Sequence, residues 1–449
     1  MEDRKHFDWR RHSEAEALFL HYLGLFSRQS RFLADLSSRI LRQTSSGILN
    51  WVDHILVENS EGIRQKLDTL GFEQQNNRTA AAYSHPGALL PSVVLVNGAS
   101  GPKPGIALRV ESVEKFFDAN NLKLDAEGPA MSPYRRSLVT AEDGVGVWIV
   151  ERRGSFEFDP VFPQDGYLRD YRRSLDRWKN LAREKKNEED LFEQMNRVAG
   201  DLVSAFGAGP AADIVCRCER DRWLERNAAG RLQKERQDAL GLGWANQDHH
   251  TFRSSRRNFS KLINLFLKLG YQKRERFYAG KEAGWGAQVL EHPSTKLALF
   301  LDVDLASEEL DIDFSTRDLE DLETLGTVGL WCELHGDSVF EAGLHHMAAR
   351  FDFDRLIEDI AVRGVHFMAP FSHFTYLKQA FSIAEIWQVE PSRIKKLLSH
   401  KHIDEEQADK FLNKGSVGSH IENIERRDGY KGFNQENVSS IIRDTDPRK

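Results

Sequence analysis

The predicted order of strands and helices repeats along this chain, and that repetition restricts the folds available to it. In residues 51–156, a strand, a short helix and three further strands are followed by a second run of the same order. Alternating apolar and polar residues indicate the strands, and apolar residues at helical spacing indicate the helices. This βαβββ order returns twice more between residues 241 and 449, the last time with insertions. Because two such units side by side make an eight-stranded, partly open cup, the sequence predicts an α+β protein with two cups.

The same patterns place the individual elements. In the first cup, helices are expected at 60–70 and 113–120, and strands at 52–57, 72–76, 80–84, 92–96, 105–110, 122–126, 135–141 and 145–152. In the second cup, helices are expected at 259–269 and 353–363, and strands at 248–253, 272–278, 286–291, 297–303, 344–351, 380–389 and 417–426. The insertions are predicted to be helical, at 316–325 and 391–413.

Two further segments lack the repeated order. Residues 1–50 carry a dense apolar stripe near helical period, which predicts N-terminal helices that pack on the next domain. Residues 159–240 are rich in charges of both signs and in helix-forming residues, so we expect a helical connector. The predicted domains are therefore N-terminal helices, a first cup at 51–158, the connector, and a second cup at 241–449.

Length, charge and cysteine content narrow the class of protein. A chain of 449 residues is too long for one ordinary core. Its net charge of -7 argues against a nucleic-acid-binding surface over the whole chain. The three cysteines favour a reducing compartment over a disulfide framework, and Cys216 and Cys218 are too close in sequence for a zinc site. Without a secretory signal, or an apolar run near the ~18 residues of a membrane span, we expect a cytoplasmic protein with no nucleic-acid or membrane partner.

The strand at 248–253 combines residue types that suit a metal site. Side chains on a strand alternate faces, so His249, Thr251 and Arg253 are expected to point one way, and Asp248 and His250 the other. The first face offers a metal ligand with a cation four residues further on. An arginine there could hold the carboxylate of a substrate bound to the metal.

The strand that opens the last βαβββ unit contains a second histidine pair, His345 and His346. In a cup with pseudo-twofold symmetry the two opening strands lie side by side at the centre, so one histidine from each would face inward. A third ligand must come from a later strand, for which Glu422 is the choice and Glu385 and Glu425 are alternatives. Two histidines and one carboxylate leave open positions on an octahedral ion, which suits Fe(II).

Several segments carry a family resemblance. The paired βαβββ units are similar to the vicinal oxygen chelate superfamily, and residues 241–446 resemble the 2-oxoadipate dioxygenase/decarboxylase family. The matching segments, in order and with similar spacing, are DHHTFRSS, LGYQKRERFYAGKEAGWGAQVLEHP, LALFLDVDL, LHHMAARFD, LKQAFSIAE, GSHIENIERR and GYKGFNQENVSSIIRDTD.

The resemblance implies a metal site at His249, His346 and Glu422, with Arg253 holding a substrate carboxylate. It also implies that a 2-oxo acid binds the metal through its keto and carboxyl oxygens and reacts with O2 with loss of CO2. The sequence departs from the family pattern at His250, His345, Phe381 and Asn423, where substrate would lie, so the substrate is not necessarily 2-oxoadipate. The doubled histidines leave the register open, because a shift of one residue would select His250 or His345 instead.

The first cup carries only part of the same ligand pattern. It has His54 in its opening strand and Glu151 in its last, but Gly105 where a second histidine would be expected. We therefore expect a domain without a metal, which could shield the second cup or support a homodimer. The alternative is a second site formed by His54, His85 and Glu151.

Together these observations predict a non-haem Fe(II)-dependent dioxygenase that uses O2 to decarboxylate a small 2-oxo acid or related carboxylate. Arg253 would anchor the substrate, and Gln379 and Ser382 would line its pocket. His292 is expected to be structural. The competing hypotheses are a metal-dependent isomerase, lyase or hydrolase on the same cup, and a non-catalytic protein that binds a small ligand.

Overall fold

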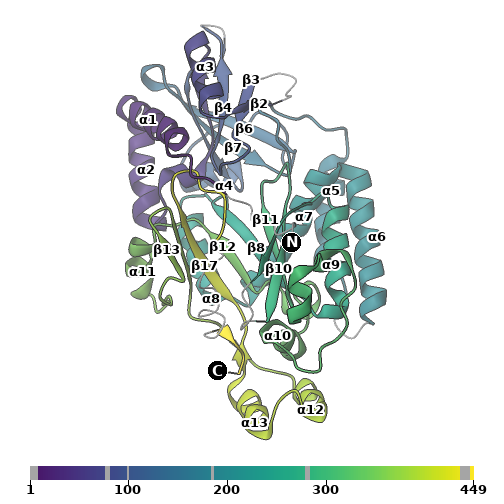
Figure 1. Cartoon of the computed structure of the whole chain (residues 1–449). Coiled ribbons are helices and arrows are strands. Elements are labelled where there is room, and N and C mark those ends of the chain that lie inside the picture. The colour runs from purple at the N-terminus through teal and green to yellow at the C-terminus, as the bar shows by residue number, and fades with distance from the viewer. Residues whose placement is uncertain are drawn as a thin grey trace.

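The computed structural model describes residues 9–75, 81–98, 101–183, 187–278, 284–434 and 445–448. They form an α+β protein in which a seven-stranded and an eight-stranded curled sheet each make a cup. Figure 1 shows the first cup above the second, with the N-terminal helices along one side and the connector helices along the other. The predicted fold class is confirmed.

The first cup follows the predicted order with one strand fewer. Its helices are α3 (Glu61–Thr69) and α4 (Val113–Ala119), and its strands are β1 (Val52–Glu58), β2 (Glu73–Gln74), β3 (Ala81–Ser84), β4 (Ser92–Val96), β5 (Gly105–Val110), β6 (Tyr134–Thr140) and β7 (Gly146–Arg152). The sheet order is β2-β3-β4-β1-β5-β7-β6, with β1 and β5 antiparallel at the centre. Of the predicted strand at 72–76, the structure describes 72–75 and retains only β2.

The predicted strand at 122–126 is wrong. Asn121 has a φ of 53°, in the left-handed region, and follows Asn120, the residue that caps the end of α4. The chain then runs to an isolated bridge between Glu127 and Arg136 without forming a ladder with β6. Side-chain alternation alone did not reveal this loss of pairing.

The second cup has eight strands, one more than the seven placed from the sequence, which missed the short strand at 372–374 and placed the strand of 377–381 at 380–389. The eight strands are β8 (Gln247–Arg253), β9 (Gln272–Tyr278), β10 (Trp285–Glu291), β11 (Ala298–Asp304), β12 (His346–Ala349), β13 (Ser372–Phe374), β14 (Leu377–Phe381) and β17 (His420–Arg426). The sheet order is β13-β14-β17-β12-β8-β11-β10-β9. At its centre β8 and β12 are antiparallel, and each has a parallel outer neighbour, β11 or β17. Helices α9 (Arg256–Lys268) and α11 (Phe353–Ala361) complete the two units.

The insertions differ in detail from the prediction. No helix longer than a 3-10 turn forms at 316–325, and α10 (Thr327–His335) lies after it instead. The carboxylate of Asp304 fixes the start of α10, because it accepts hydrogen bonds from the backbone amides of Gly326, Val328 and Gly329. The predicted helix at 391–413 is two helices, α12 (Pro391–Ser399) and α13 (Glu405–Lys414), which with the short strands β15 (Ile386–Trp387) and β16 (Ser416–Val417) separate β14 from β17.

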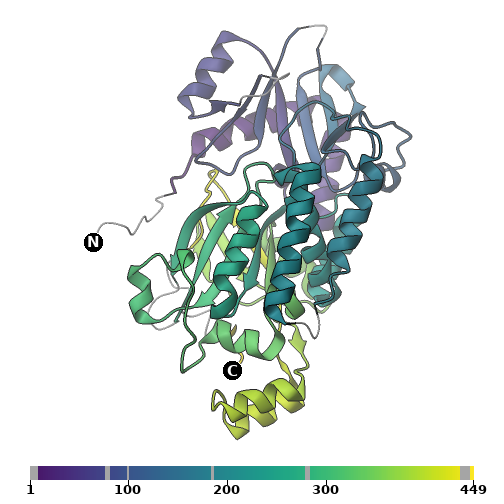
Figure 2. The ribbon, with the colours of Figure 1, turned by 90° about the vertical axis from the view of Figure 1, so that its right-hand side faces the viewer.

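The remaining helices flank the two sheets. α1 (Ser13–Gln29) and α2 (Arg31–Thr44) pack on the first cup through one apolar cluster that both helices share and a second to which α1 contributes. The connector is α5 (Tyr167–Lys179), α6 (Glu188–Phe206), α7 (Ala208–Glu225) and α8 (Ala228–Asp238). Figure 2 shows the connector helices beside α9 on the outer face of the second sheet, where they share one core with β8 and β11. Among the described residues, no helix combines the length and apolar content needed to cross a membrane.

Candidate metal centre

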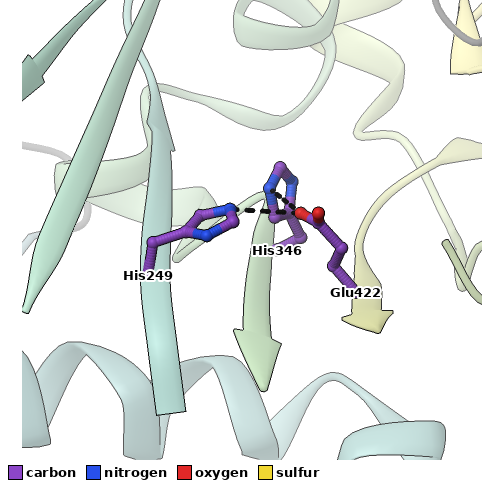
Figure 3. A group of neighbouring side chains, drawn as sticks. All are labelled: His249, His346 and Glu422. Carbon is purple, nitrogen blue, oxygen red and sulfur yellow. Dashed lines mark ion pairs between the residues drawn. The ribbon is translucent and has the colours of Figure 1, made fainter. Parts of the chain in front are cut away.

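Three adjacent strands of the second cup bring His249, His346 and Glu422 together on its concave face. The Nε2 atoms of His249 and His346 each lie 3.1 Å from Oε2 of Glu422, and all three side chains are buried (Figure 3). The register explains the convergence, because Ala348 of β12 pairs with His249 of β8 on one side and with Glu422 of β17 on the other. In the part of the chain that the structure describes, this is the one group of three side chains spaced to hold a metal ion.

The charges of the cluster suit a divalent cation. Burial alone would raise the pKa of Glu422, but the two neighbouring imidazoles hold it at about 2. Burial alone would lower the pKa of His249, but Glu422 and Asp248 raise it to about 9. A carboxylate held between two imidazoles in a buried site is an arrangement in which a divalent cation can replace a proton.

Asp248 supports His249 from an unexpected direction. Strict alternation predicted that the two side chains point to opposite faces, and this prediction is wrong. A β-bulge lies at Asp248, because Ala348 pairs with His249 whereas Ala349 pairs with Gln247. The bulge brings Asp248 Oδ1 to 3.3 Å from His249 Nδ1. A carboxylate behind a histidine fixes the orientation and tautomer of a metal-binding imidazole.

Other polar groups position the remaining two side chains. Gln379 Nε2 donates a 2.9 Å hydrogen bond to Glu422 Oε1, the carboxylate oxygen that does not face the histidines. Thr251 Oγ1 lies 2.8 Å from His346 Nε2. His345 Nδ1 lies 3.0 Å from His346 Nδ1, so His346 can donate to His345 when its Nε2 acts as a ligand.

This geometry shows which histidine of each neighbouring pair faces the cluster. His250 faces away from the cluster, and its Nε2 lies 3.3 Å from Oε1 of Gln247. His345 contacts His346 but is not part of the three-residue group. Burial lowers the pKa of both well below the ordinary value of histidine, so both are neutral. The register with His249 and His346 inward is therefore the one that the structure adopts.

The cluster opens into a cavity of about 70 Å³ with an aromatic wall. Its lining includes the rings of Phe277, Trp285, Phe300, Phe371, Phe381 and Phe433, together with Arg253, Asp302 and Gln379. Arg253 is buried, and its Nε and Nη1 atoms have no hydrogen-bond partner. Burial lowers its pKa, although Asp302 opposes that effect. Burial also raises the pKa of Asp302 to about 7, and its Oδ1 likewise has no partner.

The other candidate residues lie elsewhere. Ser382 is not part of the cavity lining, and its hydroxyl accepts a hydrogen bond from the amide of Ile421. Glu385 accepts from the amide of Ala228, and Glu425 from that of Phe353. The ring of His292 is bound to backbone groups in the turn after β10, in a structural position. Of the segment at 429–446 that resembles the family's closing motif, residues 435–444 lie outside the described residues.

The first cup has the same strand pairing as the second, but of the three ligand positions it retains only that of His54. Ala107 of β5 pairs with His54 and with Trp148, as Ala348 pairs with His249 and Glu422. Trp148 therefore stands at the position of Glu422. Glu151 is not the equivalent residue: its carboxylate accepts from the amide of Val113 and from Arg153. Among the described residues, His54 belongs to no group of three side chains spaced to hold a metal ion.

Gly105 stands where the second cup has His346. A Cβ atom at Gly105 would lie 1.8 Å from the carbonyl oxygen of Gly146, so no side chain fits there without movement of the backbone. The bulge and its aspartate are nevertheless retained, since Asp53 Oδ2 lies 2.7 Å from His54 Nδ1. The sequence pattern did not predict the contact of either aspartate with its histidine, although each aspartate directly precedes its histidine in the sequence.

Comparisons with known proteins identify no family. No protein-family model and no curated protein sequence matches the chain. A variant of 4-hydroxymandelate synthase from Streptomyces coelicolor aligns with 88% of this chain and 97% of its own, at 12% identity and a TM-score of 0.27. Methylmalonyl-CoA epimerase from Mycobacterium tuberculosis aligns with 40% of this chain and 88% of its own, at 13% identity and a TM-score of 0.23. At these values neither assigns an activity to this chain.

Proposed function

We propose that this chain is a non-haem Fe(II)-dependent dioxygenase that uses O2 in the oxidative decarboxylation of a small 2-oxo acid or a related carboxylate. The observation that carries the proposal is the presence, in one buried cavity, of a two-histidine, one-carboxylate cluster and a guanidinium with two unpartnered donor atoms. The first feature suits a metal ion with open positions, and the second suits a carboxylate.

The residues fit the metal that the proposal requires. His249, His346 and Glu422 would hold the ion, and Asp248 and Gln379 would fix the orientation of His249 and Glu422. When bound, Fe(II) would supply Lewis acidity and open positions at which a 2-oxo acid and O2 can be brought together. His249 would give up its proton on metal binding, and Asp248 would keep its Nδ1 as the protonated nitrogen.

Arg253 would bind and orient the substrate. It lies four residues after His249 on the same strand and lines the same cavity. The guanidinium lies over the ring of Trp331, but its Nε and Nη1 atoms lack hydrogen-bond partners, which is unfavourable in a buried site. A carboxylate that accepts two parallel hydrogen bonds from these atoms removes that cost. The aromatic wall would exclude water from the reacting groups, which strengthens the electrostatic interactions inside the cavity.

One observation favours a second candidate function, a metal-dependent isomerase or lyase. The carboxyl of Asp302 lines the cavity with an unpartnered oxygen and has a pKa of about 7, near that of an effective general base. Such an enzyme would need a divalent cation to stabilise an enediolate, but no O2.

An oxygen electrode distinguishes these functions. The protein should be purified without oxygen, loaded with Fe(II), and supplied with a panel of 2-oxo acids that differ in chain length and in a second carboxylate. We expect O2 consumption with release of one CO2 per O2 for at least one member, and none with the matched variant His249→Ala. If no substrate consumes O2, but the Mn(II)- or Zn(II)-loaded protein exchanges substrate α-protons with D2O under nitrogen, the isomerase or lyase function replaces the proposal.

A further inference from the structure

A second and larger cavity lies between the two cups, away from the metal centre. Its volume is about 390 Å³, within the range of small-molecule binding sites. Its walls come from the first residues of β1 and β8, residues near the ends of β5, β7 and β17, the residue that follows β12, and the turn after β10. Neither the metal ligands nor Arg253 belong to its lining.

Four arginines line this cavity, and they form two equivalent pairs. Arg109 lies two residues after Ala107 of β5, and Arg350 lies two residues after Ala348 of β12. Arg152 lies four residues after Trp148 of β7, and Arg426 lies four residues after Glu422 of β17. Because the registers of the two cups agree, each cup directs the same pair of arginines towards the space between them.

One arginine of each pair has a carboxylate partner. Arg152 binds Asp53 through Nε and Nη2, at 2.6 and 2.8 Å. Arg426 binds Asp248 through Nε and Nη2, both at 3.0 Å. These two arginines are therefore neutralised within their own cups.

The other arginine of each pair lacks a comparable partner. Among the described residues, no hydrogen bond or ion pair involves the guanidinium of Arg109, and the carboxylate of Asp53 that favours its charged form is bound by Arg152. Arg350 comes no closer than 3.9 Å to Asp248, a carboxylate already bound by Arg426, and its Nε has no hydrogen-bond partner. Burial lowers the pKa of both guanidinium groups, as expected for charges removed from water.

Among the described residues, none of the other charged groups of the cavity makes a hydrogen bond or ion pair with Arg109 or Arg350. Lys296 lies at the cavity with its Nζ over the ring of Phe156. The carboxylate of Glu291 binds Lys431 at 2.8 Å, and that of Glu16 accepts from the amide of Gly429. Glu73 lines the cavity from the short strand β2.

Uncompensated cations inside a cavity are unfavourable unless an anion joins them. Guanidinium groups offer planar pairs of donors that match carboxylate and phosphate oxygens. We propose that the cavity between the cups is a binding site for a small polyanion, one that carries at least two negative charges on carboxylate or phosphate groups and bridges Arg109 of one cup and Arg350 of the other. This site is distinct from the metal centre and does not depend on the function proposed for it.

Calorimetric titration of the full chain at constant ionic strength tests the proposal, with succinate and inorganic phosphate as separate probes and sodium chloride as the blank. We expect saturable binding of at least one probe with a stoichiometry of one. The double variant Arg109→Gln/Arg350→Gln should weaken it by about 10- to 100-fold, the value of one to two charge-assisted hydrogen bonds. The better probe identifies carboxylate or phosphate as the preferred group.

Three further variants make the outcome unambiguous. Arg363→Gln removes the same charge from an exposed residue outside the cavity and should leave binding unchanged. Lys296→Gln alters an exposed residue at the cavity without burying a new polar group, and should weaken binding even if the double variant folds poorly. Arg253→Gln, which alters the cavity of the metal centre, should leave binding of the probe unchanged. The proposal is overturned if neither probe binds saturably, or if Arg253→Gln abolishes binding that the Arg109, Arg350 and Lys296 variants retain.

Discussion

Asp248 Oδ1 lies 3.3 Å from Nδ1 of the buried His249, at the point where a bulge turns two successive side chains of β8 to the same face. Both oxygens of Asp248 also accept hydrogen bonds from Arg426, which lines the cavity between the cups. A continuous chain of contacts therefore runs from that cavity to the candidate metal centre. The first cup has the same chain, Arg152–Asp53–His54, but Trp148 stands at the register position that Glu422 occupies in the second cup.

This relationship predicts that Asp248→Asn weakens metal binding while leaving the three ligands in place. Removing a carboxylate that supports a ligand histidine costs about 10- to 100-fold in metal affinity. Equilibrium dialysis against Mn(II) or Fe(II) under nitrogen measures the change. Asp53→Asn removes the equivalent carboxylate of the first cup and should leave the affinity unaltered. Equal losses in both variants would show that the effect comes from general destabilisation.

The adopted register predicts different effects of substitutions at neighbouring histidines. His249→Ala should abolish stoichiometric metal binding, because it removes one of three ligands. His250→Gln should retain it, since His250 faces the opposite side of β8. The metal content of each variant is measured after dialysis against a weak chelator, and circular dichroism checks that both variants are folded. Metal retained by His249→Ala and lost by His250→Gln would mean that the opposite face of the strand holds the site.

Substrate binding should depend on the guanidinium of Arg253. We expect Arg253→Gln to raise the KM for a carboxylate substrate by about 10- to 100-fold, which corresponds to one or two charge-assisted hydrogen bonds. Metal affinity should stay the same, because Arg253 is not a member of the cluster. Steady-state kinetics with the substrate found in the oxygen-electrode panel, together with metal dialysis, separates the two effects. An unchanged KM would remove Arg253 from the substrate site.

The alternation of strand residues placed His249 and Arg253 on one face, and the pairing of the opening strands predicted one histidine from each. The choice of His346 over His345 and of Glu422 over Glu385 and Glu425 rested on the family resemblance, because a doubled histidine leaves the register open. The alternation failed at Asp248 and Glu151. A bulge interrupts the period at Asp248, and the residue equivalent to Glu422 is Trp148, whose position depends on pairing with β5. The alternation of residues within one strand does not show how that strand pairs with its neighbour.

The cavity between the cups was missed for a related reason. Arg109 and Arg350 lie 241 residues apart in the chain and are equivalent only after both sheets have formed with the same register. Taken singly in the sequence, each is an ordinary arginine at the end of a strand. α10 was misplaced because its start is fixed by Asp304, a side chain on the distant strand β11.

The connector helices contain a buried ion pair whose loss should appear in acid. Glu219 of α7 is fully buried and accepts hydrogen bonds from Trp178 of α5 and from both Arg183 and Arg222. Burial alone would raise the pKa of Glu219, but the arginines lower it to about 2 from an ordinary value of 4.5. Because the folded pKa is depressed, the stabilisation is fully present above pH 4.5. It is lost as the pH falls from 4.5 to 2, and its size is about 3 kcal/mol.

We therefore expect Glu219→Gln to lower the free energy of unfolding at pH 7 by about 3–5 kcal/mol, since Arg183 is left buried without its counter-charge. The variant should also lose much of the parent's pH dependence between pH 4.5 and 2. Urea unfolding at a series of pH values measures both quantities. Glu127→Gln, which breaks a partly exposed ion pair with Arg136, should change stability by less than about 1 kcal/mol. A variant of Glu219 as stable as the parent at pH 7 would show that the pair contributes no net stabilisation.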